Sequence, residues 1–307
     1  MKKKVLILVN TGTPDSYETS SVRSYLSQFL NDRRVIDMPF LLRLLLVNLI
    51  IVPFRAPVSA KKYKSIWTGS GSPLLANMKS LTEKLQKKLT DEYVVFGAMR
   101  YGNPSIKSVL ARVRDIEPES VKIFPLYPHY ASSTTGSVIE YVMKTVRKWE
   151  AFPELTFTGQ FYSHPLYIES VVKQVLKHDL SQYDHILFSY HGLPEKQIEK
   201  IHPATGIRRC SCENGMPDHG IFCYRATSYE TTRLLAGKLK LSGDIFSTSF
   251  QSRFSTDWLA PFTDSVLKEL ARNGKKRVLM VAPSFTADCL ETIHEIGVEY
   301  KIGRAHV

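Results

Sequence analysis

The sequence predicts an α/β fold with parallel sheets whose two faces are covered by helices. The main observation is that short apolar runs alternate with amphipathic helical stretches along the whole chain. The second is the length, since 307 residues at about 150 residues per domain suggest two domains. The third is an ordinary globular composition, 43% hydrophobic and 23% charged, which excludes a disordered or fibrous protein.

Apolar runs mark the predicted strands. Each is short, uninterrupted and rich in Val, Ile, Leu and Phe, as expected of strands buried on both faces of a parallel sheet. In chain order the runs are 5–9, 93–98, 121–125, 156–160, 185–189, 245–249 and 277–281.

Helices are predicted between these strands where apolar side chains recur every three or four residues. The apolar faces are Met78, Leu81, Leu85 and Leu89; Val138, Tyr141, Val142 and Val146; and Val171, Val172, Val175 and Leu176. Helices in these places would cover the sheets that the strands form.

The chain is basic, with 41 Lys and Arg against 29 Asp and Glu and a formal charge of +12. Such an excess suits nucleic acid, anionic lipid or an acidic small molecule. No Cys2His2 spacing, RNP-like strand or basic heptad region occurs, so a nucleic-acid partner is not expected. Only four cysteines occur and the N-terminus lacks the features of a signal peptide, so we expect a protein of the reducing cytoplasm.

A nearly continuous apolar stretch at residues 39–54 interrupts the alternation. Its 16 residues fall short of the ~20 that a membrane-spanning helix needs. Two interpretations remain open, a buried core helix and an exposed lip that enters a bilayer interface or admits an apolar ligand. The cationic residues that follow, among them Arg55 and Lys61, suit the second.

Polar side chains follow six of the predicted strands. Because ligands of open α/β sheets bind beyond the carboxyl ends of the strands, these segments predict one shared cleft. The segments are 10–12, 100–102, 127–136, 190–194, 251–252 and 285–291.

Three residues of these segments, and Glu295 just after the last of them, carry candidate chemistry. His191 would present a neutral imidazole at a strand end, where it can accept a proton or bind a metal. Asp288, Glu291 and Glu295 have a spacing that places three carboxylates on one helix face. The alternative for Asp288 is an acidic residue that favours a helix N-terminus.

Two weaker patterns concern anions and metals. Residues 132–136, Ser-Ser-Thr-Thr-Gly, precede a predicted helix and resemble an anion-binding turn, although the Walker spacing is absent. Cys210, Cys212 and Cys223 lie in one irregular segment, as the thiols of a metal or iron–sulfur site do. Three unrelated thiols remain the alternative.

The motifs together resemble the ferrochelatase family, whose members insert ferrous iron into a porphyrin. They occur in the order found in that family and span nearly the whole chain. The matching stretches are LVNTGTP at 8–14, GSP at 71–73, RYGNP at 100–104, YPHYASSTTG at 127–136, FSYHGLP at 188–194, WLAP at 258–261 and SFTADCLETIHEI at 284–296.

The resemblance implies two similar doubly wound, Rossmann-like domains that enclose a porphyrin cleft. His191 and Glu291 match the catalytic proton-accepting or metal-binding groups of the family, and Asp288 and Glu295 extend the metal set. Positions that match porphyrin-binding residues are Thr11, Arg55, Ser72, Arg100, Tyr101, Ser133, Thr134, Trp258 and Phe285.

The chain departs from the family pattern at three positions. Thr11 stands where relatives often carry Met or Tyr near the metal, and Cys289 replaces a His of some relatives. Relatives with an internal [2Fe–2S] cluster often carry a further Cys five residues after the match to Cys223, where this chain has Ser228. A cluster at Cys210, Cys212 and Cys223 would need Ser228 or a more distant thiol as its fourth ligand.

The resemblance therefore implies a porphyrin metal chelatase of the lyase class. We expect it to insert Fe²⁺ into protoporphyrin IX, releasing two protons and forming protohaem, the final step of haem biosynthesis. The alternatives are a coproporphyrin III ferrochelatase, a non-catalytic haem or porphyrin carrier and, on the 132–136 turn, an α/β enzyme for a phosphate ligand.

The expected domains are residues 1–155, with the apolar lip at 39–60, and residues 156–301. Family chains usually continue beyond the match to Tyr300, so we expect a truncated chain in which 302–307 are not native. The lip predicts peripheral contact with an anionic membrane. We thus expect a cytoplasmic protein, peripheral on the inner membrane.

Overall fold

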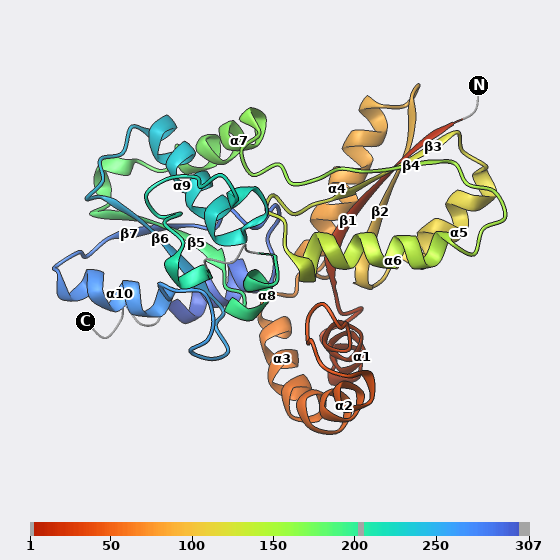
Figure 1. Ribbon diagram of the computed structural model, residues 1–307, viewed down its shortest axis with the longest axis horizontal. Helices are drawn as coiled ribbons and strands as arrows, with labels where there is room; N and C mark the ends of the chain where they lie inside the picture. The colour runs from red at the N-terminus through yellow and green to blue at the C-terminus, as the bar shows by residue number, and fades with distance from the viewer. Residues whose placement is uncertain (1–2, 202–205, 301–307) are drawn as a thin grey trace. The chain divides into compact units, whose positions relative to one another are not determined.

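The computed structural model describes residues 3–201 and 206–300 (Figure 1). The chain forms two compact units, each with its own parallel sheet. The first unit comprises Met1–Tyr127, Ser132–Gly159 and Ala287–His294; the second comprises Pro128–Ala131, Gln160–Thr286 and the residues from Glu295 onward. Two parallel sheets with their helices confirm the predicted α/β class. The expected non-native residues 302–307 lie outside the described part.

The sheet of the first unit has four parallel strands in the order β2-β1-β3-β4. They are β1 Lys4–Thr13, β2 Tyr93–Gly102, β3 Ser120–Pro125 and β4 Glu154–Phe157. Each contains or overlaps one of the apolar runs predicted as strands.

Side chains of the central strand β1 alternate between the two faces of this sheet. Val5, Ile7 and Val9 belong to a buried cluster with apolar residues of α5 (Ile106–Ile116) and α6 (Ser137–Val146). Leu6 and Leu8 belong to a second cluster with Met78 of α4 (Pro73–Lys88). Both faces of the strand are therefore buried, which explains its continuous apolar sequence.

β1 and β2 extend beyond their apolar runs and remain paired at their polar ends. Gly12 lies opposite Tyr101, and Thr13 lies opposite Gly102. At Gly12, φ is +113° and a Cβ would lie 1.7 Å from the Tyr101 carbonyl oxygen, so a side chain cannot fit. The expectation that 10–12 and 100–102 follow the strands is wrong, because the backbone ladder continues past the apolar core and includes them in β1 and β2.

Three helical pieces follow α1 (Thr19–Leu30) and form one helical segment, Phe40–Ile66. The pieces are α2 Phe40–Leu45, the π-helical η1 Leu46–Ile51 and α3 Val52–Ile66. We call this segment the lip helices; Figure 1 shows them together with α1. One stripe of the lip helices, including Val47, Val52 and Ala56, packs against α1 in a buried cluster.

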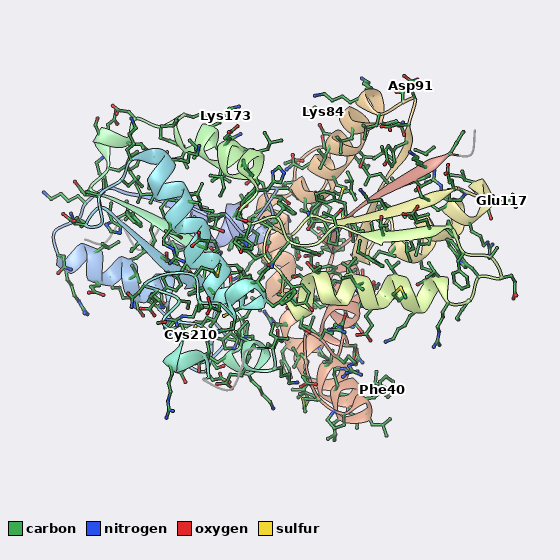
Figure 2. All side chains as sticks on the ribbon, turned by 45° about the horizontal axis from the view of Figure 1, so that its top comes forward. Phe40, Lys84, Asp91, Glu117, Lys173 and Cys210 are labelled. Atoms are coloured by element: carbon green, nitrogen blue, oxygen red, sulfur yellow. The ribbon has the colours of Figure 1, made fainter. Side chains whose placement is uncertain are left out.

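The opposite stripe of the lip helices is exposed, and Figure 2 shows Phe40 at its outer end. Its large apolar side chains are Phe40, Leu41, Leu42, Leu44, Leu45, Leu49, Ile50, Phe54 and Val58. The sequence left open a buried core helix or an exposed lip, and the segment has both properties, since one stripe is buried and the other is exposed. At 27 residues it is long and apolar enough by composition to cross a membrane, in contrast to the 16 residues considered first. Its packed stripe indicates an amphipathic helix of this unit.

The second unit has three parallel strands in the order β6-β5-β7. They are β5 His185–His191, β6 Phe246–Gln251 and β7 Val278–Val281. On one face, Ile186, Phe188 and Tyr190 pack with residues of α7 (Pro165–Val175) and α9 (Tyr224–Leu239).

The other face of β5 is polar at Ser189. This hydroxyl lies 2.9 Å from Gln251 Oε1 and 2.9 Å from Thr263 Oγ1, at the start of α10 (Thr263–Arg272). The remaining helical elements in the described part of the chain are short, except for the last. They are η2 Ser132–Gly136, η3 Leu180–Gln182, α8 Glu195–Glu199, η4 Ile207–Arg209, η5 Gly220–Phe222 and η6 Glu291–Glu299.

Candidate active site

His191 is the last residue of β5, which brings its imidazole to the carboxyl edge of the second sheet. Its backbone N–H donates to Ser284 Oγ at 3.2 Å, and its carbonyl accepts from Tyr224 Oη at 2.9 Å. The ring lies beside Trp258 and Phe285, with centroids 6.5 and 6.2 Å away. The structure thus brings three of the predicted site residues together within the second unit.

The His191 ring has a defined orientation because Nδ1 lies 2.6 Å from the Gly192 carbonyl oxygen. A carbonyl oxygen only accepts, so Nδ1 carries the hydrogen of the neutral ring and Nε2 carries the lone pair. Glycine is needed at this position, since a Cβ would lie 2.7 Å from the Gln251 carbonyl oxygen. The His-Gly sequence therefore presents Nε2 as the basic atom.

Glu295, also in the second unit, is a hydrogen-bond acceptor for three side chains. Ser252 Oγ donates to its carboxylate at 2.5 Å, Tyr300 Oη at 3.0 Å and Gln251 Nε2 at 3.5 Å. Burial raises the pKa of Tyr300, and the Glu295 charge raises it further, so this phenol stays protonated and donates.

Asp288 and Glu291 belong to the first unit, whereas Glu295 belongs to the second. The helix that follows Asp288 is the π-helix η6, which begins only at Glu291. The expected helix face with all three carboxylates therefore does not form. Asp288 instead accepts from Thr292 Oγ1 at 3.1 Å, and the same Thr292 oxygen accepts from the Cys289 N–H at 3.0 Å.

Two buried tyrosines lie in the electrostatic field of Glu291. Burial raises the pKa of Tyr25 of α1 and of Tyr63 of α3 far above the ordinary value, and the Glu291 charge adds to both shifts. Burial also raises the pKa of the Cys289 thiol, again with a contribution from Glu291. Neither tyrosine was predicted from the sequence, because neither lies in a segment that follows a predicted strand.

Two residues of the first unit that were predicted to bind porphyrin, Thr11 and Ser72, form hydrogen bonds with other side chains. Thr11 Oγ1 lies 3.0 Å from Tyr127 Oη, and burial raises the pKa of that phenol. Ser72, itself buried, accepts from Thr13 Oγ1 at 2.9 Å. Both hydroxyls are therefore engaged within the unit.

Arg100 and Tyr101 meet at one carboxylate, Asp32, which the sequence analysis did not single out. Arg100 Nη2 lies 2.6 Å from Asp32 Oδ2, and Tyr101 Oη donates to the same oxygen at 2.9 Å. Burial alone would raise the pKa of Asp32, but hydrogen bonds from Ser137 and the Arg34 backbone and the Arg100 charge hold it below its ordinary value. Asp32 is therefore ionised at neutral pH.

The predicted anion-binding turn at 132–136 is a five-residue π-helical turn, η2, that continues into α6. Ser132 Oγ accepts from Arg34 Nη1 at 2.9 Å, so this hydroxyl is engaged by a side chain of the same unit. Ser133 and Thr134 are partly buried, and Thr135 is buried.

The three clustered thiols are all buried (Figure 2 labels Cys210). Burial raises the pKa of Cys212 to about 12 and that of Cys223 to about 11, and Cys210 adds to both shifts. His219, which the sequence analysis missed, has Nε2 3.7 Å from Cys210 Sγ. Ser228, the suggested fourth ligand, is fully buried on α9 and donates to the Tyr224 carbonyl at 2.8 Å.

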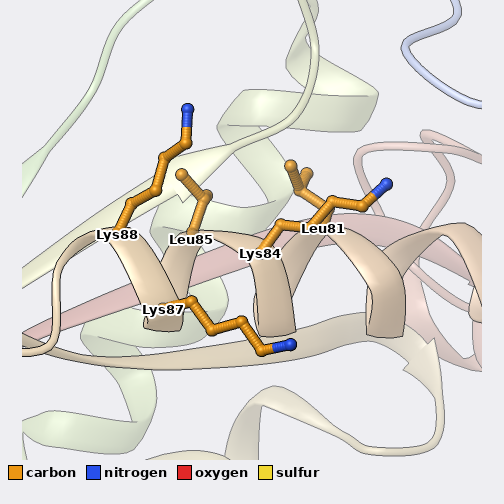
Figure 3. A pocket seen from close by; sticks show the side chains of 5 residues that line it. All are labelled: Leu81, Lys84, Leu85, Lys87 and Lys88. Carbon is orange, nitrogen blue, oxygen red and sulfur yellow. The ribbon is translucent and has the colours of Figure 1, made fainter.

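Within residues 3–201 and 206–300, no group of three or more His, Cys, Asp and Glu side chains is arranged to hold a metal ion. A hollow of about 440 Å³ lies on the surface of α4, lined by two leucines and three lysines (Figure 3). None of the predicted site residues lines this hollow. Arg55 is exposed on α3, beside the exposed stripe of the lip helices.

The chain is similar to known proteins along almost its full length. Residues 3–305 match the family described as Ferrochelatase. A ferrochelatase of Legionella pneumophila (strain Paris) is 43% identical over 302 residues, which cover 97% of this chain and 89% of that protein. A ferrochelatase of Coxiella burnetii is 41% identical over 298 residues, which cover 95% and 82%.

Proposed function

We propose, on the premise that this chain belongs to the ferrochelatase family, that it inserts Fe²⁺ into protoporphyrin IX and forms protohaem. The family's activity is the insertion of iron into a porphyrin. Its members are porphyrin metal chelatases of the lyase class and act in haem biosynthesis. Fe²⁺ and the porphyrin are the substrates. The choice of protoporphyrin IX over coproporphyrin III is the finer part of the proposal.

We propose His191 as the catalytic base. Metallation removes two protons from the pyrrole nitrogens, so the reaction needs a proton acceptor near the porphyrin. The hydrogen bond from Nδ1 to the Gly192 carbonyl supports this role because it leaves the lone pair on Nε2. The aromatic rings of Trp258 and Phe285 beside the imidazole suit the apolar face of a porphyrin.

His191→Ala tests this role directly. We expect the rate of Zn²⁺ or Fe²⁺ insertion to fall about 10²- to 10⁴-fold, while porphyrin binding, followed by fluorescence, changes little. The exposed His178 provides the matched control, since His178→Ala also removes one imidazole. Near-normal turnover in His191→Ala would remove this residue from the mechanism.

We propose Glu291 as the second proton-accepting or metal-binding group, with Asp288 and Glu295 as further metal-binding carboxylates. Fe²⁺ must lose water ligands before it enters the macrocycle, and carboxylate oxygens can replace them. Glu291 lies near the buried tyrosines Tyr25 and Tyr63, whose pKa values its charge raises, and this proximity supports the proposal.

The proposed porphyrin contacts differ in how their polar groups are engaged. Arg55 is exposed and cationic, which suits a porphyrin carboxylate. The polar ends of Arg100 and Tyr101 bond to Asp32 and Tyr101 is buried, so these two residues are proposed as porphyrin positions by resemblance. Thr11, Ser72, Ser133 and Thr134 complete the proposed set by resemblance alone.

Substrate choice is tested by comparing metallation of protoporphyrin IX and coproporphyrin III under anaerobic conditions. We expect the larger kcat/KM for protoporphyrin IX. A larger value for coproporphyrin III would reassign the substrate, and an unmetallated Soret band with both would indicate a carrier. Phosphate compounds should not compete with either porphyrin.

The described residues do not fit a resident [2Fe–2S] cluster. Three buried thiols lie together, but Ser228 is committed to a backbone carbonyl and no metal-binding group of three or more ligands occurs in the described part of the chain. No step of the proposed mechanism passes through a cluster. The visible spectrum of anaerobically purified protein, with iron and sulfide assays, tests the prediction of a cluster.

We propose that the lip helices contact an anionic membrane and that the protein is cytoplasmic, peripheral on the inner membrane. The exposed apolar stripe would enter the interface, and the cationic residues of α3, including Arg55 and Lys61, would face the lipid headgroups. Fractionation of cells at low and high salt tests the location, since an electrostatically assisted contact weakens as salt increases.

A further inference from the structure

The nine residues from 31 to 39, which we call the lip root, connect α1 to the lip helices. Two ion pairs of opposite polarity join the lip root to the sheet side of the first unit. Asp32 pairs with Arg100 of β2, and Arg34 pairs with Glu140 of α6. An acidic and a basic residue two positions apart thus bind complementary charges on two different elements.

Asp32 is the more deeply buried anchor, with a side chain only 7% exposed. Its Oδ2 accepts from Arg100 Nη2 at 2.6 Å, Tyr101 Oη at 2.9 Å and Ser137 Oγ at 2.5 Å. Its Oδ1 accepts from the Arg34 N–H at 2.8 Å, so the carboxylate also shapes the backbone of the lip root. One side chain therefore fastens the lip root to β2 and to α6 together.

Arg100, the cationic partner of Asp32, is also largely buried. The Arg100 guanidinium lies 4.5 Å from the centre of the Tyr101 ring and 4.3 Å from that of Tyr141. Its Nε donates to Ser137 Oγ at 2.7 Å, and the side chain is 14% exposed. Removing the Asp32 charge would leave a largely buried cation without its counter-ion, a strongly unfavourable state.

The end of the lip root that leads into α2 is held by a side chain of the lip helices, Arg43. Arg43 of α2 is buried, and its Nη1 donates to the Met38 carbonyl at 2.7 Å and to the Ile36 carbonyl at 3.4 Å. The Ile36 N–H in turn bonds to the Asp32 carbonyl at 2.9 Å. Hydrogen bonds thus connect Asp32 with α2 through the backbone of the lip root.

We propose that Asp32 is a positioning residue that holds the lip helices in the orientation needed to bind the porphyrin. It does so by fixing the lip root on β2 and α6, and it orients Arg100 and Tyr101 through the same carboxylate. The inference rests on the proposed role of the lip and of these two residues in porphyrin binding. The partners of Asp32 are all side chains or backbone of its own unit, so in this proposal its loss weakens binding more than chemistry.

Asp32→Asn is the decisive variant because it keeps the shape of the side chain and removes its charge. We expect the Kd and the KM for porphyrin to rise about 10-fold or more, which corresponds to the loss of a charge-assisted hydrogen bond. We expect kcat to stay within about 3-fold, a split that general destabilisation would not produce. Amide deuterium exchange should speed up in residues 31–45 and not in β3.

Asp115→Asn is the matched control, since Asp115 forms an exposed ion pair with Arg114. It should leave binding and exchange unchanged. Ser137→Ala removes one of three donors to Asp32 Oδ2 and should shift the Kd in the same direction by less, which provides a test if Asp32→Asn fails to fold.

Folded Asp32→Asn with wild-type exchange in residues 31–45 and a wild-type Kd would overturn the proposal. So would a fall in kcat with an unchanged KM, or, if Asp32→Asn does not fold, a Ser137→Ala variant with a wild-type Kd and exchange. If the wild-type protein bound porphyrin without metallating it, the proposed activity would fail, while the Kd and the exchange would still decide the role of Asp32.

Discussion

Buried His129 should make the second unit less stable in mild acid. Burial lowers the pKa of this imidazole from the ordinary 6.5 to about 3. Thr231 Oγ1, which lies 2.9 Å from Nε2, donates its own hydrogen to the Thr227 carbonyl at 2.9 Å. Nε2 therefore carries the ring hydrogen, and the buried Nδ1 has no hydrogen-bond partner among residues 3–201 and 206–300. Protonating Nδ1 would place an unpaired charge among three tyrosine rings.

The size of the effect follows from the two pKa values of His129. Because the folded-state pKa is the lower one, the unfolded chain binds the proton first as the pH falls. The stabilising contribution is complete above about pH 6.5 and is lost as the pH falls towards 3. Linkage gives a loss of about 2 kcal/mol at pH 5 and about 5 kcal/mol well below pH 3.

Urea unfolding at pH 7.5 and pH 5.0 measures this loss. The free energy of unfolding of the wild-type protein should fall by about 2 kcal/mol more than that of His129→Gln, which has no imidazole to titrate. His178→Gln, at an exposed position, should behave as wild type. In the folded wild-type protein, the nitrogen resonances of His129 should remain those of a neutral ring at pH 5. An equal pH dependence in wild type and His129→Gln, or a charged ring at pH 5, would refute the reasoning.

Three further variants test other parts of the structure. Gly12→Ala should lower the free energy of unfolding by at least about 3 kcal/mol, because its Cβ meets the Tyr101 carbonyl at a positive φ; urea titration measures this. Glu291→Gln should slow metal insertion about 10²-fold or more with porphyrin binding retained, as measured by Soret absorbance and porphyrin fluorescence. Replacing Leu45 and Ile50 together by Ser should weaken flotation with anionic liposomes about 10-fold or more, since both side chains are exposed on the lip helices.

Each of these substitutions has a matched control. Gly159→Ala adds a Cβ that meets no atom within 4 Å and should leave stability nearly unchanged. Glu169→Gln changes an exposed glutamate of α7 and should not affect turnover. Leu166 and Leu176, exposed on and just after α7, provide the Ser pair that should still float with liposomes. A control that changed as much as its test variant would contradict the corresponding prediction.

The sequence predicted the strands well because burial on both faces leaves a strong local signal. Every predicted apolar run overlaps a strand of the two sheets. The ends of β1 and β2 were missed, since the ladder between Gly12 and Tyr101 depends on backbone pairing between distant segments and not on apolar side chains. The π-helix that begins at Glu291 was missed for a related reason, because a 3.6-residue pattern carries no signal for a wider turn.

His191 and Glu291 could be singled out from the sequence because they belong to recognisable motifs, and their roles stay predictions. Asp32 could not be found in this way, because nothing near it in the sequence shows that Arg100, Tyr101 and Ser137 converge on its carboxylate. A lone acidic residue after a helix usually faces water. Only the packing of the lip root against the sheet gives it a buried role.

The two stripes of the lip helices have different tolerances to change. Ala56 and Ala60 lie in the packed stripe, where a larger side chain would force α1 and α3 apart and destabilise the unit. Leu41 and Leu49 on the opposite stripe touch mainly solvent, so exchanging them for other residues alters the unfolding equilibrium little. The hydrophobicity of the exposed stripe can therefore change, in evolution or by design, while the fold stays intact.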